Sequence, residues 1–197
     1  MPSATLDRPG APAARRGLLG RVFGAFTGRR RAADGPAGLT AYDFEFQSID
    51  GEPLKLADWR GRALLVVNTA SQCGFTQQYV ALQHLHQTYG ARGLTVIGVP
   101  SNDFGSQEPG TEAQIKAFCK SKFNVQFPLT AKTTVVGGDA HPFYRWAGRE
   151  LGPAARPRWN FHKYLVARDG RIDDWFSTVT GPTSRRVVAA IERVLGA

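Results

Sequence analysis

Two continuous apolar runs, separated by one amphipathic segment, most constrain the fold of this 197-residue chain. The runs are ALLVVNT at residues 63–69 and LTVIGVP at residues 94–100, and both are rich in β-branched residues. Such runs are typical of strands that are buried on both faces of a sheet. Between them, an apolar stripe at helical spacing predicts a helix from about Phe75 to Tyr89. A strand, a helix and a strand in this order predict a βαβ unit with two parallel strands.

Turn signals and periodic patterns divide the rest of the chain. Asp-Gly pairs at residues 50–51 and 169–170 lie within alternating stretches and predict a β-hairpin on either side of the βαβ unit. Thr111 and Gln114 have the spacing of a capping box and predict the start of a second helix. Residues 125–138 are expected to be weakly extended. A short helix then precedes the second hairpin, and an amphipathic helix closes the chain.

This order of elements predicts an α/β domain with a thioredoxin-like fold over residues 39–197. The expected architecture is a central mixed sheet flanked by helices, with an N-terminal β-hairpin. The length suits one ordinary domain. In a thioredoxin-like fold a reactive cysteine follows the first core strand at the start of a helix, and Cys73 occupies that position.

The first 38 residues differ in composition from the rest of the chain. They are rich in Ala, Gly and Pro and hold seven arginines against two aspartates, so they carry +5 of the net charge of +9. This composition predicts a basic disordered tail over residues 1–38. Apolar residues between Leu18 and Phe26 leave open an amphipathic helix on a membrane surface, or an export signal. Nucleic-acid binding is not expected, because no nucleic-acid-binding motif accompanies the basic arm.

The chain has two cysteines, Cys73 and Cys119, which lie 46 positions apart. Two cysteines are too few for a disulfide scaffold, and this spacing fits no common zinc motif. No HxH or HExxH pattern is present, so we expect no metal and no bound cofactor. This cysteine usage favours a reducing, cytoplasmic location. The basic tail leaves export or membrane-surface association open.

Cys73 lies where the first apolar run gives way to small polar residues and then to the predicted helix. The motif is Cys73-Gly74-Phe75-Thr76, so the second cysteine of a C-x-x-C redox pair is missing. A helix N-terminus favours the thiolate, and a thiolate can attack a peroxide oxygen to give a sulfenic acid. The alternative is an inert core cysteine, but the neighbouring Ser, Gln and Gly are not typical of a core.

Three stretches, VNTASQCGFTQQY, PSNDFGSQEPG and WNFHKYLV, occur in this order. Together they resemble the glutathione peroxidase family, in the form that carries cysteine rather than selenocysteine, and the resemblance extends from about Leu39 to the C-terminus. It implies a thiol-dependent peroxidase with a catalytic tetrad of Cys73, Gln107, Trp159 and Asn160. The three partners of the cysteine supply N–H donors, which can stabilise a thiolate and hold the peroxide.

Cys119 lies in the stretch FCKSKF, on the predicted helix that follows Gln107. Thioredoxin-dependent members of the family carry their resolving cysteine on this helix, so the resemblance implies that Cys119 resolves the sulfenic acid. The alternative is a core residue, because Cys119 shares a helical face with Ile115 and Phe118. The implied co-substrate is a thiol reductant, either thioredoxin or glutathione. A monomer is expected, because the long insertion that tetrameric members carry before the W-N-F motif is missing here.

The sequence is compatible with three alternative functions. The first is a thiol-dependent peroxidase that reduces hydrogen peroxide and organic hydroperoxides through a cysteine sulfenic acid. The second is a thiol-disulfide oxidoreductase, which the missing C-x-x-C motif disfavours. The third is a non-catalytic membrane- or partner-binding protein that acts through its basic tail.

Overall fold

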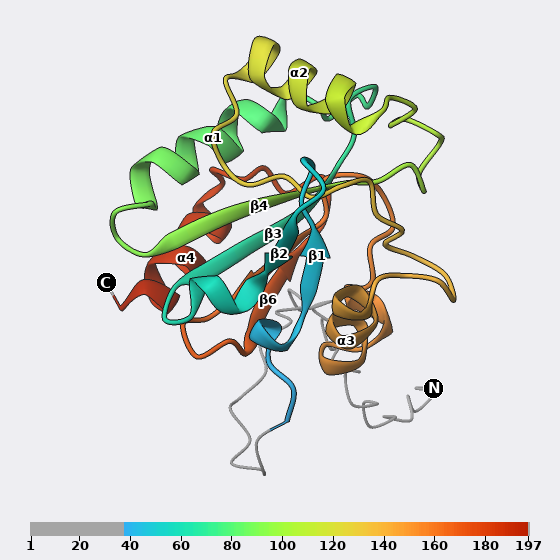
Figure 1. Ribbon diagram of the computed structural model, residues 1–197. Helices are drawn as coiled ribbons and strands as arrows, with labels where there is room; N and C mark the ends of the chain where they lie inside the picture. The colour runs from blue at the N-terminus through green and yellow to red at the C-terminus, as the bar shows by residue number, and fades with distance from the viewer. Residues whose placement is uncertain (1–37, 197) are drawn as a thin grey trace, which may run out of the picture.

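The two apolar runs form adjacent central strands in the computed structural model, which describes residues 38–196 (Figure 1). Strands β3 (Ala63–Thr69) and β4 (Leu94–Pro100) pair in parallel along their whole length, and every residue of both strands is buried. Helix α1 (Gln78–Tyr89) connects them. The predicted βαβ unit is therefore confirmed.

The second hairpin completes the main sheet. Strand β5 (Lys163–Val166) runs antiparallel to β3, and β6 (Ile172–Phe176) runs antiparallel to β5, which gives the order β4-β3-β5-β6. The turn before β6 requires glycine at position 170. Gly170 has a φ of 83°, and a Cβ atom there would lie 2.5 Å from the ring of Tyr42. The mixed sheet predicted from the sequence is confirmed.

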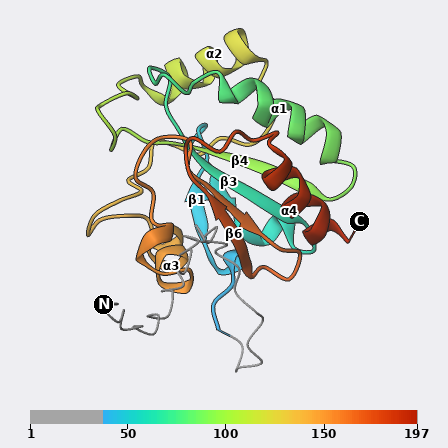
Figure 2. The same ribbon diagram turned by 180° about the vertical axis from the view of Figure 1, so that it is seen from behind.

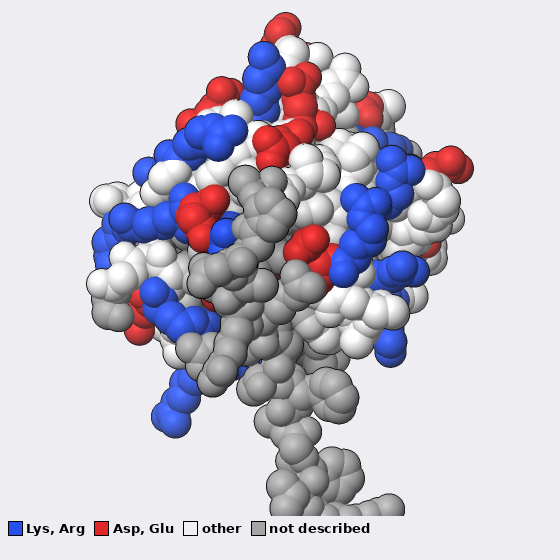
Figure 3. Space-filling model, turned by 90° about the horizontal axis from the view of Figure 1, so that it is seen from below, with Lys and Arg blue, Asp and Glu red and all other residues white. Residues whose placement is uncertain are grey.

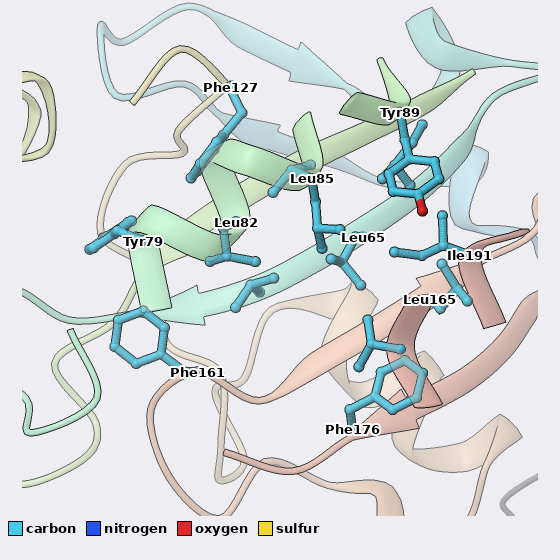
Figure 4. Packing of buried hydrophobic residues seen from close by; sticks show 14 of the residues in the cluster. Leu65, Tyr79, Leu82, Leu85, Tyr89, Phe127, Phe161, Leu165, Phe176 and Ile191 are labelled. Atoms are coloured by element: carbon cyan, nitrogen blue, oxygen red, sulfur yellow. The ribbon is translucent and has the colours of Figure 1, made fainter. Parts of the chain in front are cut away.

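Side chains of the sheet alternate between two hydrophobic cores, one on each face. Leu65 of β3 enters the core beneath α1 and α4 (Arg185–Leu195), where Figure 4 shows it among aromatic and aliphatic side chains from both helices. Leu64 enters the other core, beneath α3 (Pro142–Glu150). Figure 2 shows α4 and α3 well apart, with the sheet between them. The observed sheet, with helices on both faces and an N-terminal hairpin, has the predicted architecture.

The N-terminal hairpin forms a small separate sheet of β1 (Glu45–Gln47) and β2 (Pro53–Lys55), as predicted. Its turn contains Gly51 with a φ of 96°, in the left-handed region that glycine tolerates. Three short 3-10 helices complete the described elements: η1 (Ala41–Asp43), η2 (Leu56–Trp59) and η3 (Pro153–Ala155).

Two expectations about local structure need correction. Helix α1 begins at Gln78 rather than near Phe75, because residues 74–77 form tight turns that Thr76 holds to the preceding loop. Residues 125–138 form no strand and make only isolated bridges at Leu129 and Thr130. By contrast, α2 (Glu112–Phe123) begins immediately after the predicted capping box.

Of the predicted basic tail, residues 1–37 lie outside the described residues. Within residues 38–196, no helix is both long and apolar enough to cross a membrane. The part of the surface that Figure 3 colours by charge carries Lys and Arg interspersed with Asp and Glu.

Candidate active site

Cys73 lies in the loop between β3 and α1, with 8% of its surface exposed. The backbone N–H of Phe75 donates to the Cys73 Sγ at 3.4 Å, so a donor already lies beside the sulfur. Thr76, at the position of the second cysteine in a C-x-x-C motif, holds the loop together. Its Oγ1 accepts from the Cys73 N–H at 3.1 Å and shares its proton between the carbonyl oxygens of Cys73 and Ala70, at 2.7 and 2.9 Å. The threonine thus fixes the geometry of the cysteine loop.

Gln107 lies in the loop between β4 and α2, next to the cysteine loop. Its carbonyl accepts the N–H of Gln72 at 3.0 Å, which joins the two loops one residue before Cys73. Its side-chain Oε1 accepts from Asn160 Nδ2 at 3.0 Å. This bond orients the Gln107 amide and leaves its Nε2 as the remaining donor. A Cβ at Gly105 would lie 3.4 Å from that Nε2, so the small residue leaves room for the amide.

Trp159 and Asn160 precede β5, in a turn that is tied to β3. Trp159 is 39% exposed and lies against the ring of Phe104, with centroids 6.0 Å apart, whereas Asn160 is fully buried. Phe161 has a φ of 61°, an unusual backbone conformation for a bulky residue. Its N–H donates to the carbonyl of Asn68 at 2.6 Å.

Asn68 also holds this turn through its side chain. Its Nδ2 donates to the Trp159 carbonyl at 3.1 Å, and its Oδ1 accepts the His162 N–H at 3.1 Å. Thr178 adds a bond from its hydroxyl to the Asn160 carbonyl at 2.7 Å. The motif that carries two of the predicted tetrad residues is therefore fixed by polar side chains from two neighbouring segments.

Lys163 is a fully buried cation directly behind this turn. Its Nζ donates to the Phe161 carbonyl at 2.7 Å and to the Ser177 carbonyl at 3.4 Å. Burial lowers the pKa of Lys163 to about 7. Burial and the neighbouring Lys163 lower the pKa of His162 to about 3, so this histidine is neutral at physiological pH. His162 follows the W-N-F motif directly, but as a neutral imidazole it adds no positive charge to this part of the site.

Cys119 lies in α2, in the same buried core as Cys73. It is fully buried in the same core as Ile115 and Tyr79, as the core alternative predicts. Burial raises the pKa of the Cys119 thiol to about 11. Cys73 and Cys119 are both free thiols on different elements, so the described chain has no adjacent dithiol pair for the exchange chemistry of a C-x-x-C motif.

The structure therefore brings four of the five predicted site residues into one region. Gln107 and Asn160 bond directly, Trp159 adjoins Asn160 in the chain, and the Gln107 backbone is bonded next to Cys73. Cys119 shares a buried core with Cys73 but lies on α2 rather than in the loops that carry the other four residues.

A family model described as glutathione peroxidase matches residues 41–147. The hydroperoxy fatty acid reductase gpx1 of Synechocystis sp. is 42% identical over 167 residues, which cover 81% of this chain and 98% of that relative. The glutathione peroxidase-like peroxiredoxin gpx1 of Schizosaccharomyces pombe is 41% identical over 144 residues, covering 72% of this chain and 90% of that relative. The chain belongs to the glutathione peroxidase family.

Family membership confirms the resemblance inferred from the three sequence stretches and makes the chain an oxidoreductase of the thiol-dependent peroxidase type. A crystal structure of Trgpx in its apo form is similar, with a TM-score of 0.66 and 32% identity, covering 82% of this chain and 98% of that chain. The region of this chain that the family model matches contains Cys73, Gln107 and Cys119, and Trp159 and Asn160 follow that region.

Two residues that support the site were not predicted from the sequence. Asn68 is a fully buried amide at the end of an otherwise apolar strand, and Lys163 is a fully buried cation at the start of another. The sequence signal for such a supporting residue is a polar residue inside or beside an apolar run, because a buried polar group must find hydrogen-bond partners. The identity of those partners depends on the pairing of β3 with β5, which the sequence alone did not show.

Proposed function

We propose that Cys73 is the peroxidatic residue and that Gln107, Trp159 and Asn160 are its hydrogen-bond donors. The Cys73 thiolate attacks one oxygen of the peroxide. An S–O bond forms, the O–O bond breaks, and the leaving oxygen takes up a proton to become an alcohol or water. The observation that carries this proposal is the Asn160–Gln107 hydrogen bond of 3.0 Å, next to a loop in which the Phe75 N–H already points at the sulfur.

The second proposed step is the attack of Cys119 on the sulfenic acid of Cys73, which gives a disulfide and water. Cys119 must leave the core to do so, and helix α2 is suited to that movement. Only Ile115 and Cys119 are buried among its twelve residues, although Phe118 and Phe123 also pack partly against the core. A helix with so few fully buried side chains can open locally without unfolding the domain. A cavity of about 400 Å³ separates α2 from the cysteine loop, with Thr76 on one wall and Phe118 on the other.

The proposed substrates include organic hydroperoxides as well as hydrogen peroxide. Four of the five large hydrophobic side chains that are exposed in residues 38–196 belong to the segments around Cys73: Phe75, Val80, Trp159 and Val179. Such side chains offer apolar contact to the organic part of a hydroperoxide. The Synechocystis relative is named as a reductase of hydroperoxy fatty acids, which agrees with this substrate class.

The proposed reductant is thioredoxin rather than glutathione. A disulfide between two cysteines of one chain is a natural substrate for a dithiol reductant, and the Schizosaccharomyces pombe relative is named a peroxiredoxin. We further propose that the protein is a cytoplasmic monomer whose basic tail contacts membrane surfaces. The short connection from Val136 to Trp159 supports the monomer, and the charge of the tail supports the membrane contact.

Peroxide consumption tests the proposed function. The assay is run on the full chain with thioredoxin and thioredoxin reductase, and in parallel with glutathione and glutathione reductase. We expect turnover with both hydrogen peroxide and an organic hydroperoxide, faster with thioredoxin, and no turnover for Cys73→Ser. Removal of residues 1–38 is expected to leave the rate unchanged. No turnover with either reductant, in the full chain or after removal of residues 1–38, would favour the non-catalytic binding protein instead.

A further inference from the structure

A cluster of polar side chains lies between the cysteine loop and helix α2. Its members are Thr69 at the end of β3, Ser71 in the cysteine loop, Tyr79 in α1, Glu108 in the loop before α2, and Cys119 within α2. All are fully buried except Ser71, which lines the cavity beside the cysteine loop. The Tyr79 hydroxyl is close to the thiol of Cys119 and the hydroxyl of Thr69, and the Glu108 carboxyl is close to Ser71. The hydroxyl oxygens of Thr69, Ser71 and Tyr79 are buried without a regular hydrogen bond.

Glu108 is the carboxyl group of this cluster. Both of its carboxyl oxygens are buried, and no group reaches either with regular hydrogen-bond geometry, although the hydroxyl and N–H of Ser71 face them. The backbone around it is well anchored, since the Glu108 N–H donates to Asn102 Oδ1 at 2.8 Å and Lys132 Nζ donates to the Glu108 carbonyl at 3.3 Å. Buried carboxyls without regular partners are rare in native proteins and concentrate at functional sites.

The cluster brings this carboxyl within electrostatic reach of the second cysteine. Burial raises the pKa of Cys119 to about 11, so roughly one molecule in ten thousand carries the thiolate at pH 7. Ionised Glu108 opposes a second negative charge on Cys119, while the Tyr79 hydroxyl favours that charge. If the proton passes from Cys119 to Glu108 before Cys119 leaves the core, the cluster carries a single negative charge both before and after the proton transfer.

The charged surroundings of Glu108 also suit a proton acceptor. Burial raises its pKa, while Ser71 and the cation Lys132 partly oppose that rise. The other titratable groups that face it are Tyr79 in α1 and Cys119 in α2, whose pKa values burial also raises. A carboxylate with a raised pKa is a stronger base than an ordinary carboxylate, which favours its acceptance of the thiol proton.

We propose that Glu108 accepts the proton of Cys119 when Cys119 attacks the Cys73 sulfenic acid, a step that rests on the proposed resolving role of Cys119. The proton leaves Cys119 Sγ for the carboxylate, directly or through the Tyr79 hydroxyl. The Cys119 thiolate attacks Cys73 Sγ, the S–S bond forms and the S–O bond breaks. The departing hydroxide takes the proton from Glu108 and becomes water. Ser71 faces Glu108 and lines the pocket beside the cysteine loop. It therefore lies between Glu108 and the hydroxide that leaves Cys73.

The variant Glu108→Gln tests this proposal, because it keeps the shape of the side chain and removes its ability to accept a proton. Sulfenic acid formation at Cys73 is followed by stopped-flow fluorescence, and formation of the Cys73–Cys119 disulfide by rapid quenching and mass spectrometry from pH 6 to pH 10. We expect unchanged sulfenic acid formation and at least tenfold slower disulfide formation at pH 7. The remaining rate should rise steeply with pH as hydroxide replaces Glu108. The control Glu52→Gln, on the exposed hairpin turn, should match wild type in both steps.

Disulfide formation in Glu108→Gln at the wild-type rate and with the wild-type pH profile would overturn the proposal. If that variant does not fold, the wild-type profile decides: a plateau well below the pKa of Cys119 supports an internal acceptor, and a continuous rise to pH 10 refutes it. Sulfenic acid at Cys73 without any disulfide in wild type would refute this proposal and the resolving role together, leaving the peroxidase function intact. Absence of the sulfenic acid itself would refute the proposed function.

Discussion

Replacing Asn68 with alanine is expected to disturb the turn that carries Trp159 and Asn160. The substitution removes two hydrogen bonds, to the Trp159 carbonyl and from the His162 N–H, both 3.1 Å long. Each buried backbone group left without a partner costs about 1–3 kcal/mol, so the free energy of unfolding should fall by about 2–6 kcal/mol. The left-handed backbone of Phe161 costs about 1–3 kcal/mol and persists only while surrounding bonds hold the turn. Without the Asn68 side chain, the turn is expected to relax to release this strain.

The expected consequence for activity is slower oxidation of Cys73. Misplacing one oriented donor removes about 3–4 kcal/mol of barrier stabilisation, or roughly a hundredfold or more in rate. Urea unfolding measures the stability of Asn68→Ala, and stopped-flow mixing with peroxide measures the oxidation rate. A matched control is Leu94→Ala, a core truncation at the opposite end of the parallel strands, which should lower stability by about 2–5 kcal/mol and leave the oxidation rate unchanged.

The reasoning would be refuted if Asn68→Ala reacted with peroxide within twofold of wild type while its unfolding free energy fell by less than about 1 kcal/mol. It would also be refuted if Leu94→Ala slowed oxidation as strongly as Asn68→Ala, because the effect would then reflect stability alone.

Cys73→Ser is expected to lose peroxidase turnover, because a serine hydroxyl is not ionised near neutral pH; turnover within tenfold of wild type in a coupled assay would contradict this. Gln107→Ala should slow sulfenic acid formation by about 10²–10³, measured by stopped flow, because an oriented donor is lost and Asn160 loses its partner. Thr76→Val should lower the free energy of unfolding by about 1–3 kcal/mol, whereas Thr76→Ser should not; equal urea midpoints for the two variants would exclude the proposed role of the hydroxyl. Lys163→Met tests the buried cation. Burial lowers the pKa of Lys163 from 10.5 to about 7, so the unfolded state binds more protons between these pH values. The unfavourable contribution of the charge is complete below pH 7 and fades as pH rises. The stability of wild type relative to Lys163→Met should therefore increase from pH 7 to pH 10 in urea unfolding, and a constant difference would show that Lys163 does not titrate in this way.

Local patterns in the sequence predicted the elements whose formation depends on neighbouring residues. The continuous apolar runs became β3 and β4, buried on both faces. Asp-Gly pairs marked both hairpin turns, and Thr111 caps α2 by accepting the N–H of Gln114. The three family stretches also predicted Cys73, Gln107 and Asn160 as site residues, because each lies in a distinctive local motif.

Features that depend on contacts between distant segments were not predictable in the same way. The start of α1 moved from Phe75 to Gln78 because Thr76 bonds to the carbonyl of Ala70, six residues earlier. The left-handed conformation of Phe161 depends on bonds to Asn68, across the pairing of β5 with β3. Propensity and spacing carry no information about such pairings until the sheet order is known.

The most direct test of the central claim, that peroxide oxidises Cys73 and that Cys119 resolves it, is peptide mapping under non-reducing conditions. The full chain is treated with stoichiometric hydrogen peroxide, alkylated and digested, and the peptides are identified by mass spectrometry. We expect a crosslinked Cys73–Cys119 peptide that thioredoxin reduces faster than glutathione does, and that is missing in Cys119→Ser. A stable sulfenic acid on Cys73, or its mixed disulfide with glutathione, without any crosslinked peptide would contradict the claim.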